Sequence, residues 1–391
     1  MNVDAFSRVR VSEPITLFEY APIFDKASTE WEEVVHGTSA SSTITTNSYI
    51  AMRVAAADDV VIRQTYEYID YQPGKSKLSL FTGVLNVTPS LGVVARLGQY
   101  DDFNDKTVVV DGGNGHFFEM DGLTLNVVQR SGGQGTTLGN FDTRVAQVNW
   151  NIDRLDGEGP SKLRWDATDF AYLRLFVIDV QWLGIGRVRM GIYLNGTIYY
   201  LHEYLNNWGT QPYNRMEKLP LRYEIRSTGG AGELRQVCSS VIIEGGTYLP
   251  LARMSGYNTT AAVKVRRLAL RLKPAYNRVT LVLHTLSFLP GGGSSTEFDW
   301  YVHRVPATSI TTGTWLATPE IVDVNLSTTD ALSADAILLT SGFGVAHTDT
   351  SFPLEKRFMR PLVSSMNGTS FVLVVTCSVN CAIALSWIEI R

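Results

Sequence analysis

The chain has 391 residues, and its 34 basic and 38 acidic side chains give a formal charge of −4 without any long run of Lys and Arg. This balance gives no electrostatic support to nucleic-acid binding, and no apolar run reaches the roughly 18 residues that a membrane-spanning helix needs, so we expect no membrane insertion. Only 18% of the residues are charged, against about 25% in an average soluble domain, so we expect part of the surface to be buried against other subunits.

Residues 1–30 have the pattern of an extended arm. The segment Asp4–Ser12 alternates only loosely between apolar and polar side chains, and Pro14 interrupts it. An isolated extended segment cannot satisfy its own backbone groups, so it must lie along another surface. That surface is either its own domain, with the segment as an edge strand, or a neighbouring subunit. In the second alternative the docking residues are Asp4, Phe6, Arg8, Arg10, Ser12 and Phe18.

Residues 31–250 predict a large β-sandwich domain that begins with a series of strands. The expected strands are Trp31–His36, Thr43–Val54, Val60–Tyr71, Lys77–Val87 and Val93–Leu97, followed by a hairpin of His116–Met120 and Leu123–Arg130. Pro73-Gly74 predicts a type II turn. The acidic, glycine-rich segment 101–115 lacks the ligand spacing of a calcium loop, so we expect turns there and no metal site.

The segment Val148–Ser161 is the best candidate for chemistry. Asp153 and Asp156 could form a carboxylate pair, beside aromatic rings able to stack on a sugar. Aspartates in turn-rich segments more often bind nearby backbone N–H groups, which favours a structural role. The carbohydrate hypothesis assigns to one site Trp150, Asp153, Asp156, Trp165, Trp208 and Tyr213. Asp166–Asp169 is expected to cap a short helix.

Residues 173–205 predict a three-stranded meander. Asn195-Gly196 is a strong signal for a two-residue type I′ turn, because both positions tolerate positive φ. The second turn is Leu183–Gly186. Counting back from the Asn-Gly turn, the expected cross-strand partners are Leu194 and Thr197, Tyr193 and Ile198, Ile192 and Tyr199, Gly191 and Tyr200, Met190 and Leu201, and Arg189 and His202.

The remaining strands complete an all-β prediction. They are Leu221–Arg226, Leu234–Glu244, Lys264–Leu272, Val279–Leu289, Phe298–Val305, Ile321–Val324, Ala336–Leu339, Phe371–Cys377 and Ala382–Ile390. We therefore expect two β-sandwich, jelly-roll-like domains, at residues 31–250 and 251–391, preceded by the arm at residues 1–30. The segment Cys377–Cys381 is expected at the tip of a hairpin.

Catalytic motifs are absent from the sequence. The six histidines are scattered, no GxSxG or HExxH motif occurs, and three cysteines have neither disulfide-framework nor metal-site spacing. We therefore expect no catalytic residue, metal or cofactor, and a protein that is not an enzyme.

The opening Asp4-Ala-Phe-Ser-Arg-Val-Arg-Val-Ser12 resembles the start of structural proteins of tailed bacteriophages and other large DNA viruses, where the arm typically has Gly in place of Ser7. Further matching motifs are Tyr71–Ser76, Gly115 with Phe117–Glu119, Trp150-Asn151 with Asp153 and Asp156-Gly157, Gln181–Gly184 with Gly186–Val188, Leu219-Pro220 with Arg222–Glu224, and Glu244–Gly246. The resemblance covers residues 4–250 and implies a virion component.

Two functional hypotheses remain. The first is a non-enzymatic building block of the virion that assembles through its arm and strand edges with itself and with capsid, neck or tail proteins. Low charge and many strand edges suit a closed assembly, and a homotrimer is favoured. The second is a tail spike or fibre protein that binds a host-surface glycan during adsorption.

Overall fold

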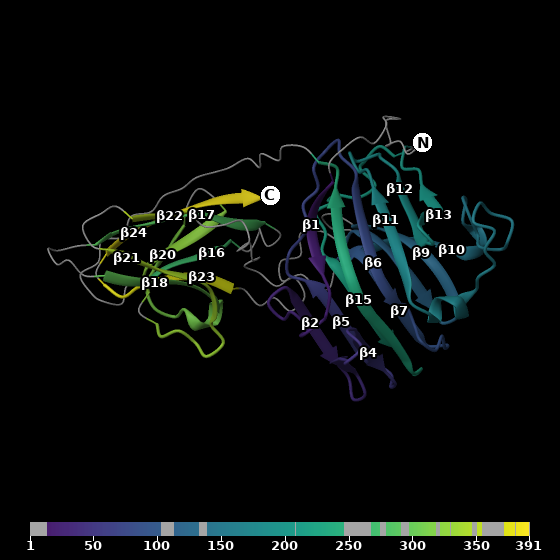
Figure 1. The fold of residues 1–391 in the computed structure, drawn as a ribbon, viewed down its shortest axis with the longest axis horizontal. Coiled ribbons are helices and arrows are strands. Elements are labelled where there is room, and N and C mark those ends of the chain that lie inside the picture. The colour runs from purple at the N-terminus through teal and green to yellow at the C-terminus, as the bar shows by residue number, and fades with distance from the viewer. Residues whose placement is uncertain are drawn as a thin grey trace. The chain divides into compact units, whose positions relative to one another are not determined.

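The computed structural model describes residues 14–102, 113–132, 139–207, 209–245, 267–273, 279–290, 297–317, 321–328, 330–345, 350–353, 371–379 and 381–390. The predicted arm residues Asp4, Phe6, Arg8, Arg10 and Ser12, together with Trp208, lie outside these ranges. The described chain consists of antiparallel strands with a few short 3₁₀ turns, so the all-β prediction is confirmed (Figure 1). It divides into two compact units, and described residues up to Gly245 belong to the first unit.

The first unit contains an eight-stranded sheet, in which seven strands follow the order β13-β12-β11-β6-β15-β4-β3 and the eighth, β1, pairs with β15. Its strands are β1 (Ile15–Tyr20), β3 (Ser41–Ile44), β4 (Ile50–Val54), β6 (Lys77–Val84), β11 (Arg174–Val180), β12 (Val188–Leu194), β13 (Thr197–Tyr204) and β15 (Gly232–Ile243). β15 pairs with β6 along one edge, while its other edge carries β4 along its first half and β1 along its second half (Figure 1).

A seven-stranded sheet has the order β10-β9-β8-β7-β14-β5-β2. Its strands are β2 (Trp31–His36), β5 (Val60–Thr65), β7 (Val93–Tyr100), β8 (Gly115–Asp121), β9 (Thr124–Gly132), β10 (Asn140–Ala146) and β14 (Leu221–Ser227). Alternate side chains of both sheets form one hydrophobic core. Phe118 and Phe176 meet across it at 4.9 Å between ring centroids, and Phe81 and Tyr223 at 5.9 Å. The two sheets therefore form a sandwich.

β1 belongs to this sandwich. Phe18 and Tyr20 are buried, and both rings pack on Trp31, at 6.0 and 5.1 Å between centroids. Phe18, predicted as a docking residue, is therefore a core residue of its own unit, because β15 supplies the backbone partners that the segment needs.

The meander confirms the type I′ turn and corrects part of the register. Asn195 and Gly196 have φ of 50° and 86°, and the four predicted pairs next to the turn are present. A β-bulge between Met190 and Gly191 shifts the remaining pairs by one residue, so Met190 lies opposite His202 and not opposite Leu201. Arg189 likewise lies opposite Glu203 and not opposite His202. A bulge inserts one unpaired residue, which turn counting cannot reveal.

Two long predicted strands are shorter in the structure. The strand expected at Thr43–Val54 is the hairpin of β3 and β4, with a turn in which Ser48 has a φ of 58°. β5 ends at Thr65, and the backbone N–H of Tyr66 makes one further hydrogen bond in the same register, to the carbonyl of Glu30 at 2.9 Å. The predicted turn at Pro73-Gly74 is present, with a φ of 85° at Gly74.

The second unit contains a six-stranded sheet, ordered β19-β20-β16-β23-β18-β21, and a three-stranded sheet, ordered β22-β17-β24. Its strands are β16 (Arg267–Leu272), β17 (Thr280–Pro290), β18 (Glu297–Pro306), β19 (Trp315–Ala317), β20 (Val322–Thr328), β21 (Ile337–Val345), β22 (Thr350–Pro353), β23 (Phe371–Cys377) and β24 (Cys381–Ile390). Phe288 and Trp300, from the two sheets, pack 5.8 Å apart in one core. The link between β23 and β24 joins the two sheets, so it is not the predicted hairpin tip.

Candidate functional site

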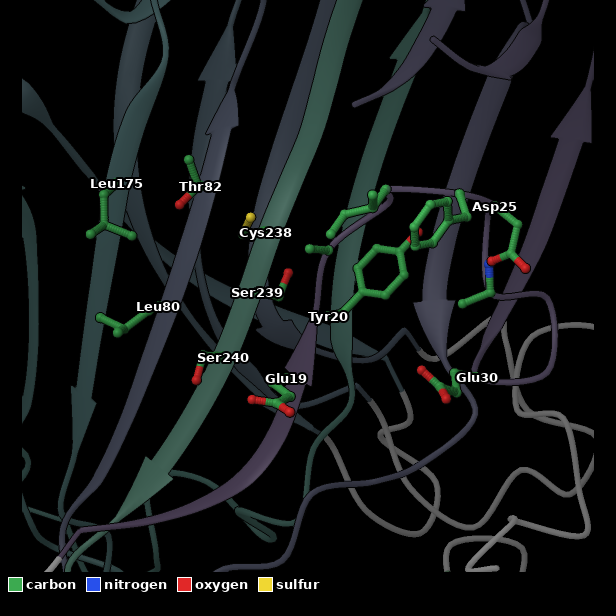
Figure 2. A pocket seen from close by; sticks show the side chains of 14 residues that line it. Glu19, Tyr20, Asp25, Glu30, Leu80, Thr82, Leu175, Cys238, Ser239 and Ser240 are labelled. Carbon is green, nitrogen blue, oxygen red and sulfur yellow. The ribbon is translucent and has the colours of Figure 1, made fainter. Parts of the chain in front are cut away.

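An open pocket with a volume of about 710 Å³ lies on the outer face of the eight-stranded sheet (Figure 2). Side chains of β6, β11 and β15 form its floor, and β1 with the segment that follows it forms one wall. This wall exists because β1 pairs with only the second half of β15, where Tyr20 lies opposite Ser239.

The floor combines apolar and hydroxyl-bearing side chains. Leu80 and Thr82 on β6 point away from the core, since the alternate residues Ser79 and Phe81 are buried. Their cross-strand partners are Ser240 and Cys238, respectively, on β15. Leu175 on β11 lies opposite Thr82 and extends the apolar part (Figure 2). Strand alternation alone therefore presents these side chains on one surface.

The wall is acidic. Glu19, Asp25 and Glu30 line it, and no Lys, Arg or His is among the lining residues. The carboxylate of Asp25 accepts a 2.7 Å hydrogen bond from the backbone N–H of Ala27, whose φ of 45° marks a tight turn. This turn holds the acidic segment beside the sheet (Figure 2).

An aromatic side chain also lines the pocket. Phe24 is 94% exposed, so its ring is available to a ligand. Burial raises the pKa of Tyr20 to about 12, so its hydroxyl stays neutral at physiological pH. Carboxylates accept hydrogen bonds from hydroxyl groups, and apolar side chains contact the C–H faces of a ligand. The pocket therefore suits a neutral polyhydroxylated ligand and disfavours an anionic one.

Nucleophilic chemistry has little support among the lining residues. Burial raises the pKa of the Cys238 thiol, which keeps it in its weakly nucleophilic protonated form. With no histidine or lysine in the lining, no side chain there is placed to activate that thiol.

The residues predicted to bind sugar lie elsewhere, and none of the five that the structure describes lines this pocket. Trp150 is 1% exposed and its Nε1–H donates to the carbonyl of Val145 at 3.1 Å. Asp153 is also 1% exposed, and its carboxylate accepts from the backbone N–H groups of Leu155 and Ser161, at 2.9 and 2.7 Å. Both side chains hold the loop from within, as aspartates in turns commonly do.

Of the other three, Asp156 and Trp165 belong to the same loop, where the backbone N–H of Trp165 donates to the carbonyl of Leu155 at 2.8 Å. Asp156 is exposed and caps its own turn by accepting from the backbone N–H of Glu158 at 2.9 Å. Trp165 is half-buried and lies under the guanidinium of Arg174, 4.3 Å from its ring centroid. Tyr213 is half-buried and packs 5.9 Å from the ring of His116.

A charged cluster occupies the outer face of the seven-stranded sheet. Arg96 binds Glu119 at 2.8 Å and Glu224 at 2.9 Å, and Arg222 binds Glu224 at 2.7 Å. Burial alone would raise the pKa of Glu224, but Arg222, Arg96 and Arg226 outweigh it and hold that pKa well below its usual range. Glu224 is therefore an ionised structural group and a poor general acid.

A second buried cluster lies at the end of β6. The Lys77 ammonium donates to the carbonyl of Glu217 at 2.7 Å and lies 3.4 Å from its carboxylate, and both side chains are fully buried. His116 and Asn214 contact the other carboxylate oxygen at 3.3 and 3.0 Å. Burial lowers the pKa of Lys77, which the Glu217 charge opposes.

Two further findings hold for the residues that the structure describes. They contain no group of three or more His, Cys, Asp or Glu side chains placed to hold a metal ion. None of their helices has the length and apolar character required to cross a membrane.

No protein-family model and no curated protein matches the sequence. Among solved structures, a β-glucanase from Bacillus licheniformis is 10% identical, with a TM-score of 0.36 over 57% of this chain and 96% of its own. A legume lectin-like domain from Entamoeba histolytica is 9% identical, with a TM-score of 0.34 over 59% and 99%. A carbohydrate esterase from Shiga toxin-encoding bacteriophage phi24B is 11% identical, with a TM-score of 0.32 over 60% and 100%. These values assign the chain to no family.

Proposed function

We propose that the first unit is a non-enzymatic saccharide-binding module. The observation that carries this proposal is the pocket of Figure 2, where an acidic wall and an exposed aromatic ring face a floor of leucine and hydroxyl side chains. A neutral sugar offers hydroxyl donors to the carboxylates and C–H faces to the apolar groups.

The protonated Cys238 thiol and the arginine-bound Glu224 support the non-enzymatic part of the proposal. A protonated thiol is a poor nucleophile, and a carboxylate whose pKa lies well below its usual range is a poor general acid and only a weak general base at neutral pH.

Binding of labelled neutral and anionic oligosaccharides to the full chain tests this function. We expect neutral oligosaccharides to bind and the Glu19→Gln variant to weaken them about tenfold, because one charged hydrogen-bond acceptor is lost. The exposed acid Glu158 lies outside the pocket, so Glu158→Gln is the matched control. Equal binding by the Glu19→Gln variant would reject this pocket as the site, and release of reducing ends would reject the non-enzymatic assignment.

A second function, that of a virion building block, has one specific structural support. Motifs that carry the resemblance to viral structural proteins meet in space although they are distant in sequence. The Tyr71 hydroxyl accepts from the backbone N–H of Trp182 at 3.0 Å, and the backbone N–H of Ser76 donates to Glu244 at 3.3 Å. The motifs therefore belong to one folded unit, which supports a resemblance to the viral structural proteins that covers the whole first unit.

In this second function the protein is located in the virion and contacts capsid, neck or tail proteins as a homo-oligomer, with a trimer favoured. Host-surface glycan binding would then serve adsorption. Antibody labelling of intact particles tests this location. Uniform labelling at one position of the particle is expected, and absence of the chain from purified particles would refute it.

A further inference from the structure

The floor of the pocket in Figure 2 continues over the sheet beyond the pocket itself. Two rows of directly opposed residues cross the strands on the outer face of the eight-stranded sheet, and opposed residues share one face. The first row is Glu19, Ser240, Leu80, Val177, Gly191 and Tyr200, and the second is Cys238, Thr82, Leu175, Tyr193 and Ile198. On the sheet the pocket extends from β1 to Leu175 on β11, whereas the rows continue over β12 and β13.

Tyr193 extends the pocket floor with an aromatic ring. It lies directly opposite Leu175, which places their Cβ atoms about 4.5–5.5 Å apart. Its neighbour Ile192 points into the core and is 1% exposed, whereas Tyr193 is 43% exposed. The ring is therefore on the solvent side of the sheet, beside the apolar part of the pocket, where a ligand can reach it.

A second tyrosine is held along the sheet at the end of the first row. The Tyr200 hydroxyl donates to Asp179 on β11, two strands away, at 3.1 Å. The side chain thus crosses β12, where its direct partner Gly191 has no side chain to obstruct it. The Arg189 guanidinium lies 4.1 Å from the Tyr200 ring centroid and also binds Asp179. These contacts fix the partly exposed Tyr200 before any ligand binds, which lowers the entropy cost of binding.

The rows define the length and charge of a matching ligand. The first row crosses six strands, so at about 4.8 Å per interval it spans about 24 Å. One interval is close to the length of one sugar unit in a chain, so the rows match about four or five units. The residues that they take from β11, β12 and β13 are all uncharged, and the adjacent Asp179 and Arg189 neutralise each other. An extended neutral chain therefore suits the rows, whereas a single sugar would occupy the pocket alone.

We propose that the pocket and the two rows together bind a linear neutral oligosaccharide, which lies across the strands and stacks one sugar ring on Tyr193. This inference deepens the saccharide-binding function proposed above and rests on it. Glu19 and the pocket floor bind one end of the chain, and Tyr193, Ile198 and Tyr200 contact the units beyond β11. The apolar faces of the sugar rings pack on these side chains, so affinity depends on chain length.

Titration calorimetry on the full chain, with oligosaccharides of increasing length, tests this inference. The probes are malto-, cello- and manno-oligosaccharides, each as the disaccharide and the pentasaccharide. Within a series that binds, we expect the pentasaccharide to bind at least about tenfold more tightly than the disaccharide, because only the longer chain occupies both the pocket and Tyr193.

Variants of Tyr193 identify the source of this gain. Tyr193→Ala should remove most of the gain and leave disaccharide affinity unchanged, which also shows that the variant is folded. Tyr193→Phe keeps the ring and should keep the gain. Phe141 on β10 of the seven-stranded sheet is similarly exposed, at 47%, so Phe141→Ala is the matched control. The proposal is overturned if Tyr193→Ala keeps the full gain, or if it loses disaccharide and pentasaccharide affinity in parallel.

Other outcomes separate the possible failures. If the pentasaccharide binds no more tightly than the disaccharide and both depend on Glu19, this inference fails while the proposed function stands. If no sugar of any kind binds, both fail together. If the parent chain associates with itself and Tyr193→Ala elutes as a smaller species in size-exclusion chromatography, the rows are an interface between copies of this chain and the inference is wrong.

Discussion

The side-chain amide of Asn151 pairs with both backbone groups of Glu203. Its Nδ2 donates to the Glu203 carbonyl at 2.9 Å, and its Oδ1 accepts from the Glu203 N–H at 2.9 Å. The next two backbone N–H groups, of Ile152 and Asp153, both donate to the carbonyl of Leu201. The segment 151–153 therefore covers the outer edge of β13, the last strand of the eight-stranded sheet. Covered edges resist pairing with other chains, so assembly through strand edges is disfavoured here.

Replacing Asn151 with alanine should expose this edge. Loss of the two hydrogen bonds should lower the free energy of unfolding by about 1–2 kcal/mol, and the freed edge should cause association that increases with protein concentration. Light scattering after size-exclusion chromatography measures this association, with Asn47→Ala at an exposed turn as the control. A variant as stable and as monodisperse as the parent would show that the edge is protected by other contacts.

His202 should make stability fall in mild acid. It is buried, and its Nδ1 accepts from the backbone N–H of Asn151 at 3.3 Å. Burial lowers the pKa of His202 to about 4. Between pH of about 6.5 and 4 the unfolded chain therefore takes up a proton that the folded chain does not, and the free energy of unfolding should fall by about 2–3 kcal/mol.

Urea unfolding across this pH range measures the effect, which should vanish above pH of about 6.5. His202→Asn keeps an acceptor without a titrating group and should remove this part of the slope. His36→Asn, at an exposed histidine, is the matched control. An unchanged slope in the His202→Asn variant would assign the acid sensitivity to other groups.

Removing one partner of the buried pair Lys77 and Glu217 should be costly. Lys77→Met leaves the Glu217 carboxylate without its cation and should lower the free energy of unfolding by about 3–5 kcal/mol. Adding Glu217→Gln neutralises that carboxylate while keeping one amide oxygen for His116 and Asn214, which both contact the same carboxylate oxygen, so the double variant should be more stable than Lys77→Met alone. Urea denaturation of the four proteins gives the coupling energy. Additive effects would mean that the two charges do not interact.

Replacement by asparagine should destabilise the protein at Asp153 but have little effect at Asp156. Asp153→Asn should lower the free energy of unfolding by about 1–3 kcal/mol, because the buried carboxylate accepts two backbone hydrogen bonds. Asp156→Asn, at an exposed turn, should change it by less than about 0.5 kcal/mol. Neither should alter oligosaccharide binding in the assay proposed above. Loss of binding in a well-folded Asp153→Asn variant would restore the sugar-binding hypothesis for this segment.

Local signals in the sequence were sufficient for much of the fold. The Asn195-Gly196 turn fixes the pairs beside it, and the Asp166 cap predicts the 3₁₀ turn that begins at Ala167. The bulge between Met190 and Gly191 has no signal in the sequence. Counting from the turn therefore pairs His202 with Arg189, whereas in the structure it pairs with Met190.

The pocket of Figure 2 was harder to predict, because its two sides are distant in sequence. Glu19 and Ser240 come together only through the pairing of β1 with β15, and no local pattern encodes that pairing. The pattern of tryptophans near aspartates predicts a sugar site at Trp150 and Asp153 instead. Tryptophan and aspartate occur in sugar sites, but tryptophan also fills hydrophobic cores and aspartate also stabilises turns. Only the burial of Trp150 and Asp153 in the structure distinguishes these structural roles from sugar binding.

The pairing of β1 with β15 also means that β1 cannot complete its sheet until most of the first unit has been synthesised. Ile15 leaves the ribosome long before Ile243, its cross-strand partner. At a synthesis rate of about 5–20 residues per second, β1 waits on the order of ten to forty seconds for β15. During that time its apolar side chains have no sheet to join, so molecular chaperones that shield nascent chains should improve the yield of correctly folded protein.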